Sequence, residues 1–160
     1  MSTSAEYGPI CSSSLGKELE TEECKALASI MNVRNLRDGE LLVPEGGEDK
    51  TLFLLAKGKL AVTSMIDGNE KIVYTMKEGE CAGTWAFVDR APRQATLRAY
   101  GDATVYAMEP DAFETLLEDH PRIVYKVMRA LFRITHTNLM RMNQETKELS
   151  NYITKSGGRY

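Results

Sequence analysis

The sequence has no long hydrophobic run and only three cysteines and two histidines, and each shortage excludes a class of protein. No apolar stretch approaches the roughly 18 residues that a membrane-spanning helix needs, so we expect no membrane span. Cys11, Cys24 and Cys81 are odd in number and show no CxxC spacing, so neither a disulfide framework nor a structural zinc site is expected. No signal-peptide pattern precedes Cys11. Together these observations predict a protein of the reducing cytoplasm.

The histidines are too few and wrongly placed for a metalloenzyme built on a β-barrel. His120 and His136 both lie outside the β-rich part of the chain, whereas such enzymes hold their metal with several strand histidines. No Ser/His/Asp or Cys/His arrangement can be placed either. We therefore expect no enzyme and no metal site. His136 is expected to face solvent, and Cys81 to be a buried structural thiol rather than a redox switch.

Charge of either sign is not in large excess, since 20 Lys and Arg face 23 Asp and Glu for a net charge of −3. The chain therefore has no overall field that attracts nucleic acid or an acidic membrane surface, and recognition of an anion has to come from a local cluster. Its 160 residues, 42% of them hydrophobic, fit one globular domain with a true core.

The order of local patterns predicts a mainly β domain with flanking helices. Residues 1–14 are small, polar and aperiodic, which predicts a disordered tail. A short helix is expected to begin at Thr21, which would serve as its cap. Residues 33–108 then hold at least six β-rich runs, such as "TLFLLAKG" and "ATVYAM", separated by glycine-bearing turns. This spacing favours an all-β sandwich or barrel.

After residue 108 the pattern becomes helical. Pro110 suits the first turn of a helix that runs to about residue 119, and His120 ends it because a residue before proline avoids the α region. A long helix is expected over residues 121–150, followed by a flexible tail over residues 151–160. The apolar stripe of the long helix is wider than a small barrel needs, so we expect a homodimer through residues 121–150. The alternative is a helix that packs only on its own core.

The stretch "GTWAFVDRAPRQATL", residues 83–97, has the chemistry of an anion site. Gly83 has no Cβ and lets a ligand approach the backbone, and the following helical turn, formed by Thr84, Trp85, Ala86 and Phe87, offers free amide N–H groups. Arg93 follows a stiffening proline, and its guanidinium can hold two phosphate oxygens at once. The stretch therefore predicts a phosphate-bearing, small-molecule anionic ligand.

The whole arrangement resembles the cyclic nucleotide-binding domain of the catabolite-activator family over about residues 15–150. The resemblance is carried by "LRDGELLVPEGG" (36–47), "LFLLAKGKLAVT" (52–63), Gly68, "MKEGECAGTWAFVDRAPRQATLRA" (76–99) and "FETLLEDHP" (113–121). It implies a double-stranded β-helix, or jelly-roll, barrel with a short N-terminal helix and two C-terminal helices. Residues 15–120 would be the nucleotide-binding core and residues 121–150 the dimerisation helix. The implied ligand is cyclic AMP or cyclic GMP, and no cofactor is required.

By resemblance, residues 83–97 form the phosphate-binding cassette of the family, and the sequence departs from the family pattern at two positions of this cassette. The family usually has a glutamate after the glycine, which accepts a hydrogen bond from the ribose 2′-hydroxyl, but this chain has Thr84 after Gly83. The loss of one charge-assisted hydrogen bond costs roughly 1.5 to 3 kcal/mol, or about 10- to 100-fold in affinity. Gln94 replaces the small residue common after the arginine, and its bulk would either crowd the phosphate or give it an amide donor.

Three further side chains have two interpretations each. Asn138 occupies the position where, by resemblance, a polar residue contacts the purine, but a lone asparagine in a helix seam also fixes register. Trp85, like Phe87, is expected to anchor the cassette in the core, with base stacking as the alternative. Arg90 is either a second anion contact or, more simply, a solvated loop residue beside Asp89.

Two functions fit the sequence. The first is a stand-alone sensory domain that binds a cyclic nucleotide in the cassette and signals through the C-terminal helix. The alternative is a degenerate domain that has lost the ligand and acts as a dimerisation or protein-interaction module. The residues after position 150 are too few for a helix-turn-helix, so we expect no direct DNA binding and an effector protein in trans.

Overall fold

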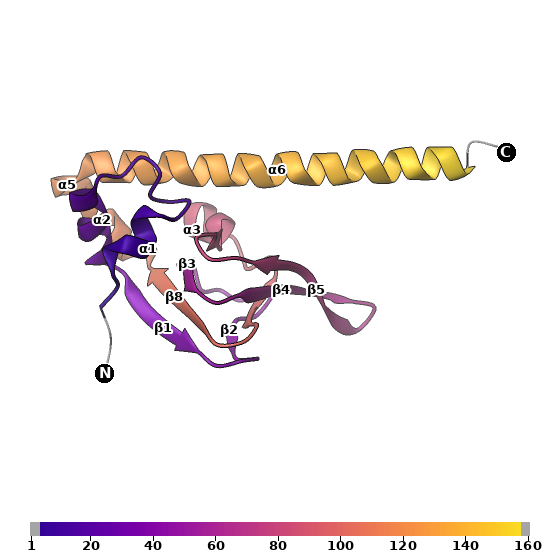
Figure 1. Cartoon of the computed structure of the whole chain (residues 1–160), viewed down its shortest axis with the longest axis horizontal. Helices are drawn as coiled ribbons and strands as arrows, with labels where there is room; N and C mark the ends of the chain where they lie inside the picture. Colours follow the sequence, from indigo (N-terminus) through magenta and orange to yellow (C-terminus); the bar gives the residue numbers. More distant parts are fainter. Residues whose placement is uncertain (1–3, 158–160) are drawn as a thin grey trace.

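The computed structural model describes residues 4–157, and their side chains as far as residue 154. The helices are α1 (Tyr7–Cys11), α2 (Thr21–Ala28), α3 (Thr84–Asp89), α4 (Pro110–Glu114), α5 (Leu116–Asp119) and α6 (Pro121–Gly157). The strands are β1 (Asn32–Leu36), β2 (Leu41–Val43), β3 (Leu52–Lys57), β4 (Leu60–Ile66), β5 (Asn69–Met76), β6 (Cys81–Ala82), β7 (Thr96–Ala99) and β8 (Ala103–Met108). Figure 1 shows the rolled strands beneath the long helix α6.

The strands form two antiparallel four-stranded sheets, in the orders β1-β8-β3-β6 and β2-β7-β4-β5. Apart from the hairpin of β4 and β5, strands that follow one another in the chain lie on opposite sheets, which is the wrapping of a jelly roll. The expected mainly β fold with a short N-terminal helix and a long C-terminal helix is confirmed. The inner faces of the two sheets pack together around Phe53, Leu60 and Val105.

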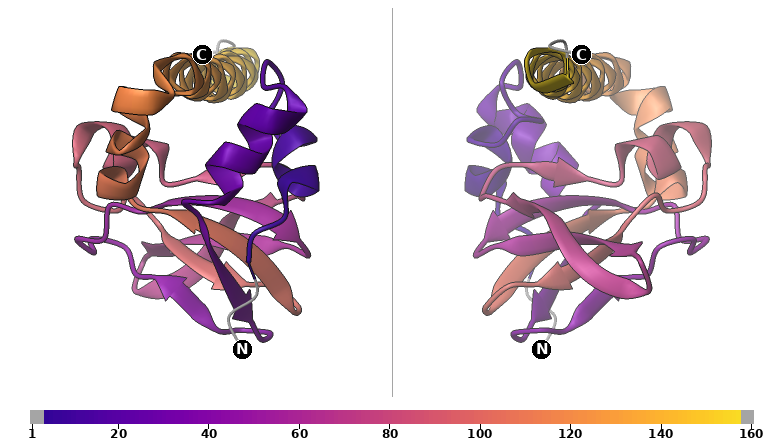
Figure 2. Two further views of the ribbon diagram at one scale, coloured as in Figure 1. Left: turned by 90° about the vertical axis from the view of Figure 1, so that its left-hand side faces the viewer. Right: turned by 90° about the vertical axis from the view of Figure 1, so that its right-hand side faces the viewer.

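Strand β3 shows why the sequence contains the continuous apolar run "LFLL". Phe53 and Leu55 point into the roll, whereas Leu52 and Leu54 pack against the helices on the outer face, and all four are fully buried. A strand covered on both faces has no polar side and therefore loses the usual alternation. Figure 2 shows the helices that provide this cover, with α1 and α2 on one side of α6 and α3, α4 and α5 on the other.

The amino-terminal segment is ordered, so the expected disordered tail over residues 1–14 is wrong for the residues that the structure describes. Residues 7–11 form α1, and Ile10 is fully buried in the core beneath the helices. Cys11 forms a disulfide with Cys24 of α2, a single bond that the expectation of no disulfide framework did not foresee. The small and polar residues around Ile10 show no apolar periodicity, so the sequence did not predict that this side chain is buried. Residues 1–3 lie outside the described residues.

Helix α2 begins at Thr21, but its cap is Glu20 rather than Thr21. The Glu20 side chain accepts from the backbone of Glu23, and Glu23 in turn accepts from the backbone N–H of Glu20 at 3.0 Å. This reciprocal pair satisfies donors that the first helical turn leaves free. The same Glu23 carboxylate accepts from Nζ of Lys126 at 2.6 Å, which ties α2 to α6.

The C-terminal helices differ from the expectation at two boundaries. The helix expected from Pro110 to about residue 119 is split into α4 and α5 at Thr115, whose hydroxyl donates to the carbonyl of Ala112. The long helix runs on to Gly157, so the tail expected over residues 151–160 is helical over 151–157, and residues 158–160 lie outside the described residues. Among the described residues, no helix combines the length and the apolar character needed to cross a bilayer.

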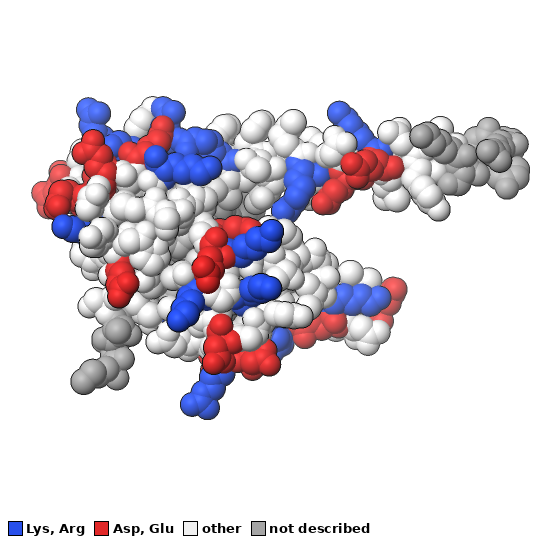
Figure 3. Space-filling view, viewed as in Figure 1, with Lys and Arg blue, Asp and Glu red and all other residues white. Residues whose placement is uncertain are grey.

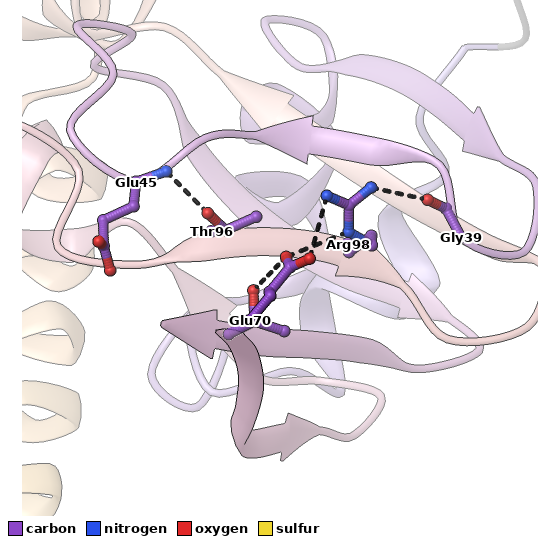
Figure 4. Close-up of polar contacts among 6 residues, drawn as sticks. Gly39, Glu45, Glu70, Thr96 and Arg98 are labelled. Atoms are coloured by element: carbon purple, nitrogen blue, oxygen red, sulfur yellow. Dashed lines mark hydrogen bonds and ion pairs between the residues drawn. The ribbon is translucent and has the colours of Figure 1, made fainter. Parts of the chain in front are cut away.

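A polar cluster on the outer face of the second sheet fixes how its strands pair. Glu70 accepts from the Thr63 hydroxyl at 2.7 Å and from Nε of Arg98 at 3.3 Å, and Nη1 of Arg98 donates to the carbonyl of Gly39 (Figure 4). These residues come from β4, β5, β7 and the turn before β2. The cluster therefore joins every strand region of this sheet on the side away from the roll interior.

Candidate anion-binding site

The site begins where β6 ends at Ala82 and the chain turns into α3. Gly83 makes this turn with φ of 87°, a left-handed conformation that side chains disfavour. A Cβ at this position would also collide with Nη1 of Arg93 and lie 3.0 Å from the carbonyl oxygen of Thr51. Glycine is therefore required here for two reasons, the backbone conformation and the close approach of the arginine.

Arg93 lies inside the protein with only 4% of its surface exposed. Its Nη2 donates to the carbonyl of Thr51 at 2.6 Å and lies 3.6 Å from Oδ2 of Asp49. Its guanidinium carbon lies 5.2 Å from the centre of the Phe53 ring, a cation–π contact on the inner face of β3. Two backbone hydrogen bonds to residues 46 and 47 fix the main chain of Arg93. The guanidinium is therefore held in place from several directions.

Two nitrogens of this guanidinium, Nε and Nη1, are buried and have no hydrogen-bond partner within residues 4–157. Buried donors are nearly always paired in proteins, because an unpaired one loses its hydration without replacement. Burial lowers the pKa of Arg93, and the nearby Asp49 carboxylate opposes that shift. The guanidinium retains its proton and offers unpaired N–H donors beside the Gly83 turn, which oxygens of a phosphate can accept.

Asp49 is the anion already present in the site. Burial alone would raise the pKa of this carboxyl, but hydrogen bonds from the hydroxyl and backbone of Thr51 and the charge of Arg93 outweigh burial and lower the pKa. Asp49 is therefore ionised at neutral pH and balances the charge of Arg93. Sequence reasoning missed both Asp49 and Thr51. The only signal was their place in the loop just before β3, opposite the cassette.

The residues of α3 are divided between core and solvent. Ala86 and Phe87 are buried, and the Phe87 ring contacts Phe113 of α4 with centroids 5.4 Å apart. Thr84 is half-buried at the start of the helix. Trp85 is 57% exposed, so the expectation that it anchors the cassette in the core is wrong. A helix of one and a half turns can bury only one face, and Ala86 and Phe87 occupy that face.

The other predicted residues are exposed, and none of their described polar contacts involves the Arg93 guanidinium. Gln94 is exposed, and its amide nitrogen donates to the carbonyl of Pro92 at 3.2 Å, within its own loop. Arg90 is exposed in an ion pair with Glu114 at 3.7 Å, in agreement with its interpretation as a solvated loop residue. Asn138 is exposed on α6, and its side chain has no hydrogen-bond partner within residues 4–157. Its contact with a base stays a prediction.

A chain of contacts joins the strand before the cassette to α6. The hydroxyl of Tyr74 on β5 donates to the Glu80 carboxylate, at 2.9 and 2.7 Å to its two oxygens. The guanidinium carbon of Arg141 on α6 lies 4.5 Å from the centre of the Tyr74 ring. Glu80 immediately precedes β6, which leads into Gly83. These contacts connect the residue before β6 to the middle of α6.

Cys81 lies on β6 and contacts the Ser14 hydroxyl at 3.7 Å. Burial raises the pKa of its thiol to about 12, so the thiol is protonated at neutral pH, as expected of a structural cysteine. His136 is exposed and stacks on Phe132. In the part of the chain that the structure describes, no group of three or more His, Cys, Asp or Glu side chains is arranged to hold a metal ion.

Comparison with known proteins gives one family. A family model described as cyclic nucleotide-binding domain matches residues 33–120. Over 88 residues the chain is 31% identical to cGMP-dependent protein kinase 2 of Homo sapiens, an alignment that covers 54% of this chain and 12% of the kinase. The matched region thus spans only a small part of the length of that relative.

Two solved structures share the architecture. A cyclic nucleotide-binding domain from Methylobacillus flagellatus has a TM-score of 0.83 at 19% identity, covering 91% of this chain and 86% of that chain. The catabolite activator protein of Thermus thermophilus has a TM-score of 0.76 at 24% identity, covering 86% of this chain and 63% of that chain. At identities this low, the two likenesses establish the shared fold alone.

Proposed function

Because the chain belongs to the cyclic nucleotide-binding domain family, we propose that it is a regulatory domain that binds a cyclic nucleotide, cyclic AMP or cyclic GMP, with the phosphate on Arg93. The single observation that carries this proposal is the buried Arg93 guanidinium, whose Nε and Nη1 have no partner within residues 4–157 and adjoin the Gly83 turn. A cyclic phosphodiester supplies two acceptor oxygens and one negative charge. The surrounding residues hold and orient an anion, and we assign them no catalytic step.

The output of the domain is a change in the position of α6. Glu80, Tyr74 and Arg141 form a continuous path from the residue before β6 to this helix. A ligand that draws the cassette toward its phosphate would shift Glu80 and so bias the contact between Tyr74 and Arg141. Such a switch requires the ligand to bind one helix position more tightly than the other.

The exposed face of α6 supports a homodimer. Its first turns bury Ile123, Val127 and Leu131 against the body, but an adjoining face carries a stripe at alternating spacings of three and four residues, the heptad pattern of a coiled coil. All members of the stripe are exposed: Tyr125, Met128, Phe132, Thr135, Leu139, Met142, Thr146, Leu149 and Ile153. Figure 3 shows stretches of uncharged surface along this helix. A second copy of the helix is the partner that such a seam fits.

Calorimetric titration with cyclic AMP and cyclic GMP tests the ligand. We expect binding by the wild-type chain, a loss of about tenfold or more in affinity for Arg93→Lys, which keeps the charge but not the fork of donors, and no change for Arg90→Ala on the same loop. If neither nucleotide gives binding heat at millimolar concentration, the proposal of a cyclic nucleotide sensor is rejected. The domain would then act through α6 as a dimerisation or protein-interaction module, with an effector protein in trans.

A further inference from the structure

A second arginine, Arg34 on β1, faces the interior of the roll. Side chains alternate along a strand, and Leu36 of this strand packs in the interior cluster, whereas Val33 packs against the helices. Arg34 therefore shares the inner face with Leu36, and its register partner on β8 is Val105, which is fully buried in the same interior. A charged residue on the inner face of a small roll calls for an explanation.

Arg34 and Arg93 converge on one aromatic ring. The guanidinium carbon of Arg34 lies 5.4 Å from the centre of the Phe53 ring, and that of Arg93 lies 5.2 Å from it. The two guanidinium carbons are thus no more than about 11 Å apart, a span that one phosphate group and its hydrogen bonds largely fill. Arg34 is exposed and Arg93 is buried, so the two residues occupy the open and the closed side of one site.

Arg34 changes the charge of the site. Asp49 already neutralises Arg93, so that pair alone offers an incoming anion little net attraction. Within residues 4–157, Arg34 makes no hydrogen bond or ion pair, and its charge, like that of Arg93, lowers the pKa of Asp49. Thr84 adds no charge at the position where the family pattern places a glutamate. The site as a whole carries one surplus positive charge, which matches the single negative charge of a cyclic phosphodiester.

We infer that Arg34 is a second phosphate-binding residue, which closes on the ligand from the mouth of the roll while Arg93 holds it from within. This inference rests on the proposed function, because it concerns the same ligand in the same site. The long, exposed side chain of Arg34 reaches a phosphate by rotamer changes alone. The charge of Arg34 also influences the buried groups, since after burial it is a further cause of the lowered pKa of Arg93.

The test compares Arg34→Ala with Arg37→Ala, a matched control that removes another exposed arginine just beyond β1. Cyclic AMP, cyclic GMP and inorganic phosphate are each titrated into the full chain by calorimetry, and thermal unfolding verifies that both variants fold. We expect Arg34→Ala to weaken cyclic nucleotide binding by about tenfold or more, Arg34→Lys to recover part of the loss, and Arg37→Ala to stay within about twofold of wild type. Raising the salt concentration should weaken nucleotide binding by the wild type more than nucleotide binding by Arg34→Ala.

Each outcome decides a different statement. Equal nucleotide affinity in wild type and Arg34→Ala overturns the role of Arg34 and leaves the proposed function intact. Absence of nucleotide binding in the wild type, together with phosphate binding that depends on Arg34, rejects the cyclic nucleotide and retains the two-arginine site. Absence of binding by nucleotide and by phosphate alike overturns both.

Discussion

The guanidinium of Arg141 lies over the ring of Tyr74, 4.5 Å from its centre, and joins α6 to the strand that leads to the cassette. Replacing Arg141 by alanine should leave the stability within about 1 kcal/mol of wild type, since an exposed cation–π contact contributes no more than that. Amide hydrogen exchange in the part of α6 near residue 141 should become faster. Lys147→Ala, on the same helix, is the control. Unchanged exchange in Arg141→Ala would show that this contact does not hold α6.

Alanine substitutions at Gly83 and Gly68 distinguish the cost of backbone strain from the cost of a steric collision. Both have positive φ, 87° and 80°, but a Cβ at Gly68 meets no atom within 4 Å, whereas a Cβ at Gly83 meets Arg93. Gly68→Ala should therefore lower the free energy of unfolding by about 1 kcal/mol through strain alone. Gly83→Ala should lower the free energy of unfolding by more than twice as much and displace the Arg93 guanidinium. Denaturant unfolding measures the free energy of unfolding of both variants. Equal losses in the two variants would contradict the close approach of Arg93 to Gly83.

Thr84 stands where the family pattern has a ribose-binding carboxylate. If a cyclic nucleotide binds at Arg93, Thr84→Glu should raise the affinity about tenfold or more by adding a charge-assisted hydrogen bond to the 2′-hydroxyl. Thr84→Gln supplies the same length without the charge and should gain less. Calorimetry compares the three chains. Lower affinity in the glutamate variant would show that the ribose does not lie beside α3.

The heptad stripe on α6 predicts the oligomeric state. Leu139→Glu places a charge in the seam and should convert a dimer to a monomer, because a coiled coil cannot bury an unpaired carboxylate. Thr137→Glu places the same charge outside the stripe and should leave the dimer intact. Light scattering coupled to size-exclusion chromatography distinguishes the two masses. If the wild-type chain is monomeric at high concentration, a second copy of α6 is not the partner of this stripe.

The disulfide between Cys11 and Cys24 closes a short loop with a sequence separation of 13 residues. Its reduction should lower the free energy of unfolding by about 3 kcal/mol in the chain-entropy account, which applies to a loop of this size. Dithiothreitol should therefore shift the denaturant midpoint of the wild type but not that of a Cys11→Ser, Cys24→Ser double variant. An identical response of both chains would exclude a stabilising role for this bond.

Local patterns were sufficient to predict the roll, its glycine turns and the long helix, since each depends on periodicity and turn chemistry within a few residues. They were insufficient where distant segments decide the outcome. Ile10 and Cys11 lie in a polar stretch, and only the position of α2 explains their burial and pairing. Trp85 and Phe87 are equally apolar, but the direction in which α3 meets the body buries one and exposes the other.

In the candidate site, too, residues within one short stretch were predicted from the sequence, and residues from distant elements were not. Gly83 and Arg93 were recognisable because they lie in one short stretch with a glycine, a proline and an arginine in sequence. Asp49 and Arg34 come from other elements and meet Arg93 only through the folding of the roll. The alternation of Arg34 with Leu36 in "NVRNL" was a detectable signal that β1 directs a charge inward, but it required knowing which face of the strand is interior.

The ion pairs that tie α6 to the region of α2 lie in its first part, and the contact of Arg141 with Tyr74 lies near its middle. Lys126 pairs with Glu23, and Arg129 and Arg133 pair with Glu18, whereas the helix continues for a total of 37 residues, or about 55 Å (Figure 1). If a ligand tilted α6 about its contacts near α2, this length would matter. A tilt of a few degrees there would displace the far tip by several ångströms, so a small rearrangement beside the roll would become a movement large enough for a partner protein to detect.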